Sequence, residues 1–308
     1  MNKKNKSLTI VHGFLGSGKT TFLNHYMTQI LKKDEKVALI VNEFGEFDVD
    51  SHLLSGYHVQ RTSLQGCICC DMQNDLIAHL YQLSRDETLH HIIVEATGIA
   101  NPIDILVACQ DPLIAGVLSS IDTIGVIDSI RFLNRQQYSA STRRLMEDQI
   151  RASHTLFINK VDLIRSEEAL DKVIEEVHTL APHASIALSK YGQLTQKVKE
   201  GASAQSPTFT QSHAHAHYTS LKYTFNGAVA QENFARFILN LSDNVLRLKG
   251  YIQFREQPND MFLVQYAEGL PTVENIGSDV SLPTTIVIVG EHLDKAMLRN
   301  QLDMLQFT

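Results

Sequence analysis

The sequence predicts an α/β protein in which a mostly parallel β-sheet is flanked by helices and followed by a smaller C-terminal α+β domain. Two observations lead to this fold class. Over the first two thirds of the 308 residues, short apolar runs alternate with amphipathic stretches, which is the pattern of βαβ units. After Lys190 the composition becomes small and polar, and a new series of strand and helix patterns begins at residue 218.

The first domain is expected to span residues 1–200. Short apolar runs predict strands at Leu8–His12, Val37–Asn42, His91–Glu95, Thr123–Asp128 and Thr155–Asn159. Amphipathic periodicity predicts helices after Lys19 and at Asp71–Ser84, Ser139–Ala152 and Ser166–Leu180. Sheets of this kind bind ligands at the C-terminal ends of their strands, and the nucleotide motifs described below fall at such ends.

The second domain is expected to span residues 218–308, after a flexible, histidine-bearing linker at 201–217. Strands are predicted at Tyr218–Phe225, Val245–Arg255, Met261–Tyr266 and Thr284–Val289. Helices are predicted at Gln231–Leu241 and Leu293–Leu305. Strands and helices in this order favour a small α+β domain.

Composition and charge exclude several function classes. The net charge is −7 with both signs interspersed, which argues against a nucleic-acid-binding surface and gives no support to an anionic membrane partner. No stretch approaches the ~20 apolar residues that span a bilayer, and the N-terminus lacks a secretory signal pattern, so we expect a cytoplasmic protein. The four cysteines therefore indicate metal or redox chemistry more than disulfides, although Cys109 is expected to be a buried small hydrophobe.

A complete phosphate-binding loop, GFLGSGKT, runs from Gly13 to Thr20 directly after the first predicted strand. Glycines at this spacing let backbone N–H groups face phosphate oxygens, and the N-terminus of the following helix adds positive potential. We expect Lys19 to contact the β- and γ-phosphates and the Thr20 hydroxyl to bind Mg²⁺. The residues predicted to bind nucleotide here are Gly13, Gly16, Ser17, Gly18, Lys19, Thr20 and Thr21.

A second nucleotide motif, the tetrad NKVD from Asn159 to Asp162, ends another predicted strand and resembles the base-recognition element of GTPases. A carboxylate at Asp162 accepts hydrogen bonds from guanine N1–H and the 2-amino group. Adenine lacks both donors and would leave the carboxylate unpaired, so GTP is the expected nucleotide. The stem of Lys160 is expected to cover one face of the base, and Ser189 and Lys190 to complete the pocket.

Acidic residues follow two other predicted strands. Glu95 is expected to orient Mg²⁺, and the N–H of Gly98 to sense the γ-phosphate. The segment 42–50 carries four acidic residues, which would repel a triphosphate unless cations intervene. The carboxylates of this segment, Glu43 and Asp50 among them, are therefore candidate ligands of Mg²⁺ or of a second metal. The alternatives are a capping carboxylate at Glu95 and a solvated acidic loop.

Three clustered cysteines, Cys67, Cys69 and Cys70, follow Gly66, which permits the sharp turn that would direct three thiolates at one ion. Thiolates select Zn²⁺ or Cu(I), and a tetrahedral Zn²⁺ would still lack one ligand. Glu43, a histidine or water would complete the site. Such an incomplete site suits metal exchange, although a buried cluster and a redox pair are alternative interpretations.

A histidine tract, His213, His215 and His217, lies in the predicted linker. Alternate residues of an extended segment share one face, and neutral imidazoles bind Zn²⁺, Co²⁺ or Ni²⁺. The tract is therefore a candidate for metal capture. A plain flexible linker explains the same composition.

Together these motifs resemble the CobW-type GTPases, relatives of the urease and hydrogenase nickel-maturation GTPases. The resemblance is carried, in the family's order, by GFLGSGKTT at 13–21, NEFGE at 42–46, GCICC at 66–70, EATG at 95–98 and NKVD at 159–162. A smaller domain after a histidine-bearing linker also fits the family's layout, as does a loose pattern at 246–250.

The resemblance implies slow GTP hydrolysis coupled to the delivery of Zn²⁺, or sometimes Co²⁺, to a client metalloprotein. It also implies that the three clustered cysteines bind this metal and that Glu95 serves the Mg²⁺ side. Asp50 matches the family's aspartate in the first acidic loop. Asp48 stands where the family commonly has a small residue, and Asn101 where it often has an aspartate.

The resulting hypothesis is a GTP-driven metallochaperone with Lys19, Thr20 and Glu95 as its catalytic residues. Its partners would be GTP or GDP and the apo-form of a client metalloprotein; the sequence leaves open whether the chain forms a homodimer. The rival hypothesis is a metal-sensing or metal-storing protein in which GTP is structural. A P-loop kinase is a second alternative, which the guanine tetrad disfavours.

Overall fold

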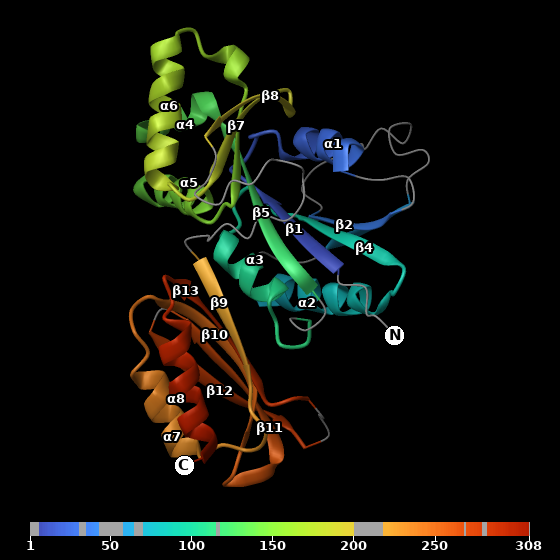
Figure 1. Cartoon of the computed structure of the whole chain (residues 1–308), viewed down its shortest axis with the longest axis vertical. Helices are drawn as coiled ribbons and strands as arrows, with labels where there is room; N and C mark the ends of the chain where they lie inside the picture. The colour runs from blue at the N-terminus through green and yellow to red at the C-terminus, as the bar shows by residue number, and fades with distance from the viewer. Residues whose placement is uncertain are drawn as a thin grey trace. The chain divides into compact units, whose positions relative to one another are not determined.

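The computed structural model describes residues 6–30, 35–42, 58–64, 70–114, 118–199, 218–267, 269–278 and 282–307 (Figure 1). Within these ranges the chain divides into two compact units. The N-terminal unit comprises Met1–Ala108 and Val117–Ala216, and the C-terminal unit comprises Cys109–Gly116 and His217–Thr308. Sequence reasoning did not anticipate that Cys109–Gly116 groups with the second unit. In the described part of the chain, no helix is long and apolar enough to cross a membrane.

The N-terminal unit is built on an eight-stranded sheet in the order β3-β2-β4-β1-β5-β6-β7-β8. Neighbouring strands are parallel except β7 and β8, which are antiparallel, so the predicted mostly parallel sheet is confirmed. The strands are β1 Lys6–His12, β2 Lys36–Asn42, β3 His58–Leu64, β4 Leu89–Glu95, β5 Leu118–Asp128, β6 Thr155–Asn159, β7 Ser185–Lys190 and β8 Gln193–Lys199. The five predicted strands correspond to β1, β2, β4, β5 and β6, whereas β3, β7 and β8 were not predicted.

The helices of this unit follow the predicted periodicity, with two additions. They are α1 Lys19–Ile30, α2 Cys70–Arg85, α3 Pro102–Cys109, α4 Ser129–Leu133, α5 Ala140–Arg151 and α6 Glu167–Leu180, and two short 3₁₀ helices are η1 Arg135–Gln137 and η2 Val161–Leu163. Helices α3 and α4 were not predicted. The side chains of Ser139, Ser166 and Asp128 accept backbone N–H bonds at the starts of α5, α6 and α4, which fixes where these helices begin.

Helix α1 covers one face of the sheet, and Figure 1 shows α2 and α3 on the opposite face. Phe22, Leu23 and Met27 of α1 pack with buried side chains of the central strands, among them Val11 and Val126. Burial of this kind stabilises the fold by about 25 cal/mol for each Å² of apolar surface removed from water. The phosphate-loop segment between β1 and α1 is therefore anchored at both ends by the core.

Strand register brings distant motifs together at the C-terminal edge of the sheet. Val11 of β1 pairs with Glu95 of β4, so the phosphate loop and the Glu95 motif begin side by side. Asp128 of β5 pairs with Asn159 of β6, which places the base-recognition tetrad next to the end of β5. This register accounts for how motifs far apart in the sequence share one edge.

The C-terminal unit contains a five-stranded sheet in the order β12-β11-β10-β13-β9, with antiparallel neighbours throughout. Its elements are β9 Tyr218–Thr224, α7 Gln231–Leu239, β10 Val245–Phe254, β11 Gln257–Ala267, β12 Leu270–Gly277, β13 Thr285–Glu291 and α8 Lys295–Phe307. The predicted α+β character is confirmed, and β12 is the one strand of this sheet that was not predicted. Both helices pack their apolar faces on the sheet, as Phe234 of α7 and Leu302 of α8 illustrate.

Lys249 and Gly250, in the motif at 246–250, have separate structural roles. The Lys249 Nζ atom lies 3.0 Å from Oδ2 of Asp111, and the Asp111 side chain is completely buried. A Cβ atom at Gly250 would lie 2.6 Å from the Thr285 carbonyl oxygen and 2.3 Å from Ile286 Cγ2, so only glycine lets β10 approach β13 this closely.

Candidate functional site

The phosphate loop begins where β1 ends at His12, and glycines carry its unusual backbone. Gly13, Gly16 and Gly18 have φ angles of 145°, 69° and 95°, in the region that favours glycine. A Cβ atom at Gly13 would lie 2.2 Å from the Val126 carbonyl oxygen. The glycine spacing read from the sequence is therefore required by the geometry of the loop and by its close approach to β5.

Lys19, the first residue of α1, is half-buried, and its side chain folds back over the loop. Its Nζ donates to the carbonyl oxygens of Gly13 at 2.9 Å and Phe14 at 3.5 Å. Burial lowers the pKa of the Lys19 ammonium, and the negative charge of Glu95 acts in the opposite direction. A phosphate at this position would offer the ammonium stronger, charged acceptors.

Thr20 and Glu95 meet although they lie far apart in the sequence. The Thr20 hydroxyl donates to Glu95 Oε1 at 2.9 Å. A hydroxyl and a carboxylate oxygen are the ligands that a hard cation such as Mg²⁺ takes, so this pair fits the predicted cation. Thr21, also predicted to contact the nucleotide, lies beside Thr20 in the first turn of α1.

Gly98 lies directly against the phosphate loop. A Cβ atom there would lie 2.6 Å from the backbone nitrogen of Leu15, so a side chain would separate the two segments. Its carbonyl oxygen accepts a hydrogen bond from Gln149 Nε2 at 3.3 Å, and the same nitrogen donates to the Ala100 carbonyl at 3.2 Å. Gln149 was missed by sequence reasoning. The signal that could have identified it is its position as a polar residue on the buried face of α5, next to Ile150.

The base-recognition tetrad is bonded to the phosphate loop. Asn159 Nδ2 donates to the Ser17 carbonyl at 2.9 Å, and its Oδ1 accepts from the Ser189 hydroxyl at 3.2 Å. Lys160 adopts a left-handed conformation with φ of 62°, and its Nζ donates to the Gly16 carbonyl at 2.6 Å. Asp162 lies in η2 and is exposed, so its carboxylate is accessible to a ligand.

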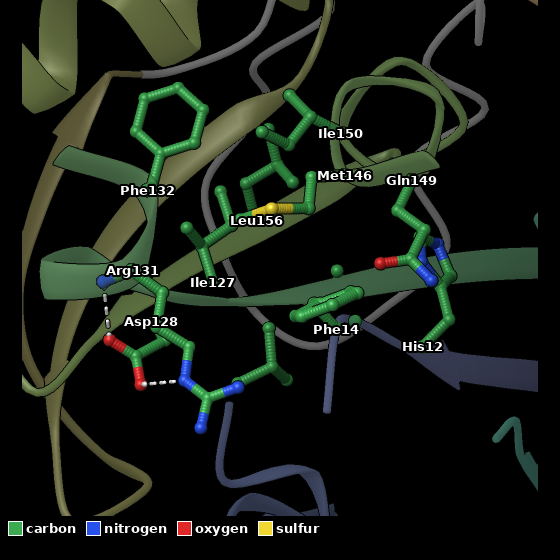
Figure 2. Close-up of a pocket in the computed structure, with 13 residues that line it drawn as sticks. His12, Phe14, Ile127, Asp128, Arg131, Phe132, Met146, Gln149, Ile150 and Leu156 are labelled. Carbon is green, nitrogen blue, oxygen red and sulfur yellow. Dashed lines mark hydrogen bonds and ion pairs between the residues drawn. The ribbon is translucent and has the colours of Figure 1, made fainter. Parts of the chain in front are cut away.

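A small pocket lies behind the phosphate loop (Figure 2). It is lined by His12, Gly13, Phe14, Gly125, Val126, Ile127, Asp128, Arg131, Phe132, Met146, Gln149, Ile150 and Leu156. Burial, helped by the positive charge of Lys19, lowers the pKa of His12 to about 3, so its imidazole is neutral near pH 7. Within the described residues, His12 Nδ1 has no hydrogen-bond partner, and Nε2 lies 3.3 Å from the Ser153 hydroxyl.

Most of the predicted metal ligands lie outside the described residues: Glu43, Asp50, Cys67, Cys69, His213, His215 and His217. Cys70 is the first residue of α2, which places the end of the cysteine motif at a helix start. Within the ranges that the structure covers, no group of three histidine, cysteine or acidic side chains could hold a metal. Cys109 is fully buried, which raises the pKa of its thiol and confirms its prediction as a core residue.

Comparison with known proteins identifies two family regions. The family described as "CobW/HypB/UreG, nucleotide-binding domain" matches residues 7–187. The family described as "Cobalamin synthesis protein cobW C-terminal domain" matches residues 218–306.

Curated relatives match over nearly the whole chain. The zinc chaperone YjiA of Escherichia coli K12 is 25% identical over 319 residues, covering 95% of this chain and 96% of the relative. The zinc chaperone CobW of Pseudomonas aeruginosa is 26% identical over 342 residues, covering 96% of this chain and 90% of the relative. A crystal structure of Zn(II)-bound YjiA GTPase from E. coli aligns with a TM-score of 0.46 at 19% identity, covering 99% of each chain. Because the nucleotide-binding family matches more than half of its length, the chain belongs to the CobW/HypB/UreG family.

Proposed function

We propose that this protein is a GTP-hydrolysing metallochaperone that binds Zn²⁺, or alternatively Co²⁺, through Cys67, Cys69 and Cys70 and delivers it to a client metalloprotein. The observation that carries the proposal is the attachment of the guanine tetrad to the phosphate loop through Asn159 and Lys160. The names of the relatives, two zinc chaperones that match over nearly the whole chain, support the choice of metal.

GTP would bind at the edge where the phosphate loop, the Glu95 motif and the tetrad meet. Backbone N–H groups of the loop hold the phosphates, and the exposed carboxylate of Asp162 selects guanine over adenine. The ammonium of Lys19 transfers its hydrogen bonds from loop carbonyls to phosphate oxygens. The negative phosphates then favour the charged form of this half-buried lysine, which burial alone disfavours.

Thr20 and Glu95 would hold Mg²⁺, which supplies charge stabilisation to the phosphoryl group when it is bound. Gly98, which Gln149 bonds and which packs against the phosphate loop, would sense the γ-phosphate through its N–H group. No described side chain stands out as the one that positions water, so we expect hydrolysis to be slow without a partner.

The metal site would form next to this edge of the sheet. Asn42 of β2 pairs with Leu64 of β3, so the segments that carry Glu43 and Cys67 leave the sheet from neighbouring strand ends. Paired strands lie about 4.8 Å apart, and each residue extends the chain by at most about 3.6 Å, so Glu43 is within reach of the cysteines as a fourth ligand. Asp50, on the same acidic segment, would serve Mg²⁺ or the cargo metal.

Hydrolysis would then change metal affinity, because the acidic segment would respond to the γ-phosphate and would share the cargo site. The segment between β3 and α2 carries Cys67 and Cys69, and Cys70 begins α2. Strand β2 pairs with both β3 and β4. The structural change that follows loss of the γ-phosphate would thus be transmitted to the metal site through neighbouring strand ends. The client would take the metal through the open coordination position of the thiolate site.

Steady-state GTP hydrolysis tests this proposal against its rivals. The purified chain is expected to release phosphate over many turnovers, at a rate that changes when Zn²⁺ is added. Absence of turnover would favour a metal-storing protein in which GTP is structural. Radiolabelled phosphate that moves from GTP to a small-molecule acceptor instead of water would favour a kinase.

A further inference from the structure

Three consecutive carbonyl groups of the phosphate loop each accept a hydrogen bond from a side chain outside the loop. Arg131 Nη1 donates to the Leu15 carbonyl at 2.8 Å. Lys160 Nζ donates to the Gly16 carbonyl at 2.6 Å, and Asn159 Nδ2 donates to the Ser17 carbonyl at 2.9 Å. Two of these donors belong to the guanine tetrad, whereas Arg131 comes from α4 and belongs to no recognised nucleotide motif.

These bonds orient the N–H groups of the loop. In a trans peptide the carbonyl and the following N–H point in opposite directions. A donor on the carbonyls of Leu15 and Ser17 therefore turns the N–H groups of Gly16 and Gly18 away from the donors, as a phosphate cradle requires. The Ser17 N–H, which follows the Gly16 carbonyl, instead donates to the Phe14 carbonyl at 3.1 Å and closes a turn of the loop. A cation at the carbonyl also polarises the peptide and strengthens its N–H as a donor.

Asp128 connects two of the three donors. Its carboxylate is 6% exposed, with Oδ2 lying 2.7 Å from Lys160 Nζ and 3.7 Å from Arg131 Nε. Its Oδ1 accepts the Arg131 backbone N–H at 3.0 Å and so caps α4. Figure 2 shows both links between Asp128 and Arg131. The register that pairs Asp128 with Asn159 places this carboxylate beside the tetrad.

We propose that Asp128 and Arg131 are positioning residues of the nucleotide site. Asp128 holds the Lys160 ammonium and the Arg131 guanidinium on the phosphate-loop carbonyls. The Arg131 contact aims the following Gly16 N–H at the phosphates, and the Lys160 contact fixes the peptide whose N–H closes the turn of the loop. The inference rests on the proposed function, because it assigns the loop to GTP. A purely structural Asp128 would act through the α4 cap alone, and the two roles can be separated.

Asp128→Asn separates them, because asparagine caps a helix as well as aspartate does but carries no charge. We expect this variant to bind GDP and a GTP analogue about tenfold more weakly, since a charge-assisted contact is worth roughly 1.5–3 kcal/mol and part of it survives. Arg131→Gln is expected to weaken both nucleotides about threefold, because its partly exposed guanidinium is screened. In the double variant, nucleotide affinity should fall by less than the product of the two single-variant factors, since both side chains act through one carboxylate.

The measurement is a fluorescence titration with labelled GDP and a labelled GTP analogue, together with a thermal melt of each variant. Asp171→Asn, an exposed carboxylate on α6, is the matched control and should leave binding unchanged. The preference for guanine over adenine nucleotides should also stay unchanged, because Asp162 is intact.

Equal affinities of Asp128→Asn and the wild type would overturn the inference while leaving the proposed function standing. A wild-type chain that binds neither nucleotide would overturn both. If Asp128→Asn lowers the melting midpoint, the Arg131→Gln variant decides between the two roles. Weaker nucleotide binding by Arg131→Gln with an unchanged melting midpoint supports the positioning role. Unchanged nucleotide binding by Arg131→Gln contradicts it.

Discussion

Asp162→Asn is expected to exchange guanine specificity for xanthine specificity. The side chain is exposed in η2, next to the tetrad residues that bond the phosphate loop. A carboxylate there accepts from guanine N1–H and the 2-amino group, whereas an asparagine amide would face that amino group with a donor. Xanthine carries an oxygen at this position and restores the pairing. Sites built on such hydrogen bonds discriminate by roughly 10⁴-fold, so GTP affinity should fall by about 10³-fold or more.

The measurement compares GTP and XTP as substrates and as competitors of labelled GDP. XTP should become the better ligand of the variant, while the wild type prefers GTP. Asp171→Asn makes the same chemical change on an exposed helix and should keep the wild-type preference. An Asp162→Asn variant that still prefers GTP would show that the base is read elsewhere, and the guanine assignment of the tetrad would then be wrong.

Replacing the three clustered cysteines is the second change with a large expected effect. Cys67→Ala/Cys69→Ala/Cys70→Ala removes every thiolate of the proposed site, and the remaining oxygen ligands hold Zn²⁺ far less tightly. Protein purified from metal-replete cells should contain about one zinc per chain in the wild type and almost none in the variant. Mass spectrometry of the bound metal gives both the identity of the ion and its stoichiometry.

Cys109→Ala is the matched control for this experiment. Cys109 is fully buried, and burial raises the pKa of its thiol, so it is not available as a thiolate ligand. Its replacement should leave the zinc content unchanged. If the triple variant retained the full zinc content, the cargo site would have to lie elsewhere, with the histidine tract at 213–217 as the first candidate.

The sequence was sufficient where a local pattern determines structure. The five buried strands read as apolar runs, and the glycine spacing of the phosphate loop reappears as three positive φ angles. By contrast, β3, with the sequence HVQRTSL, has no apolar run and forms the edge of its sheet. Strand β12 is exposed along most of its length and lies at the edge of the second sheet. Edge strands are specified by pairing with a neighbour, which a single sequence does not display.

Side chains that act through tertiary contacts were missed for the same reason. Asp128 ends a predicted strand, but its bond to Lys160 depends on the register between β5 and β6. Gln149 reaches Gly98 only because α5 packs against that segment, and nothing in the local sequence links the two. Thr20 and Glu95 were each predicted to serve Mg²⁺, but the hydrogen bond between them was not predicted.

In the proposed function, the bound nucleotide sets the affinity of the metal site. A zinc titration against a chromophoric chelator measures this affinity on the Mg²⁺-loaded chain, once with a non-hydrolysable GTP analogue and once with GDP. The two zinc affinities should differ by at least about tenfold, which corresponds to a coupling free energy of about 1.4 kcal/mol. Equal zinc affinities in the two nucleotide states would contradict it.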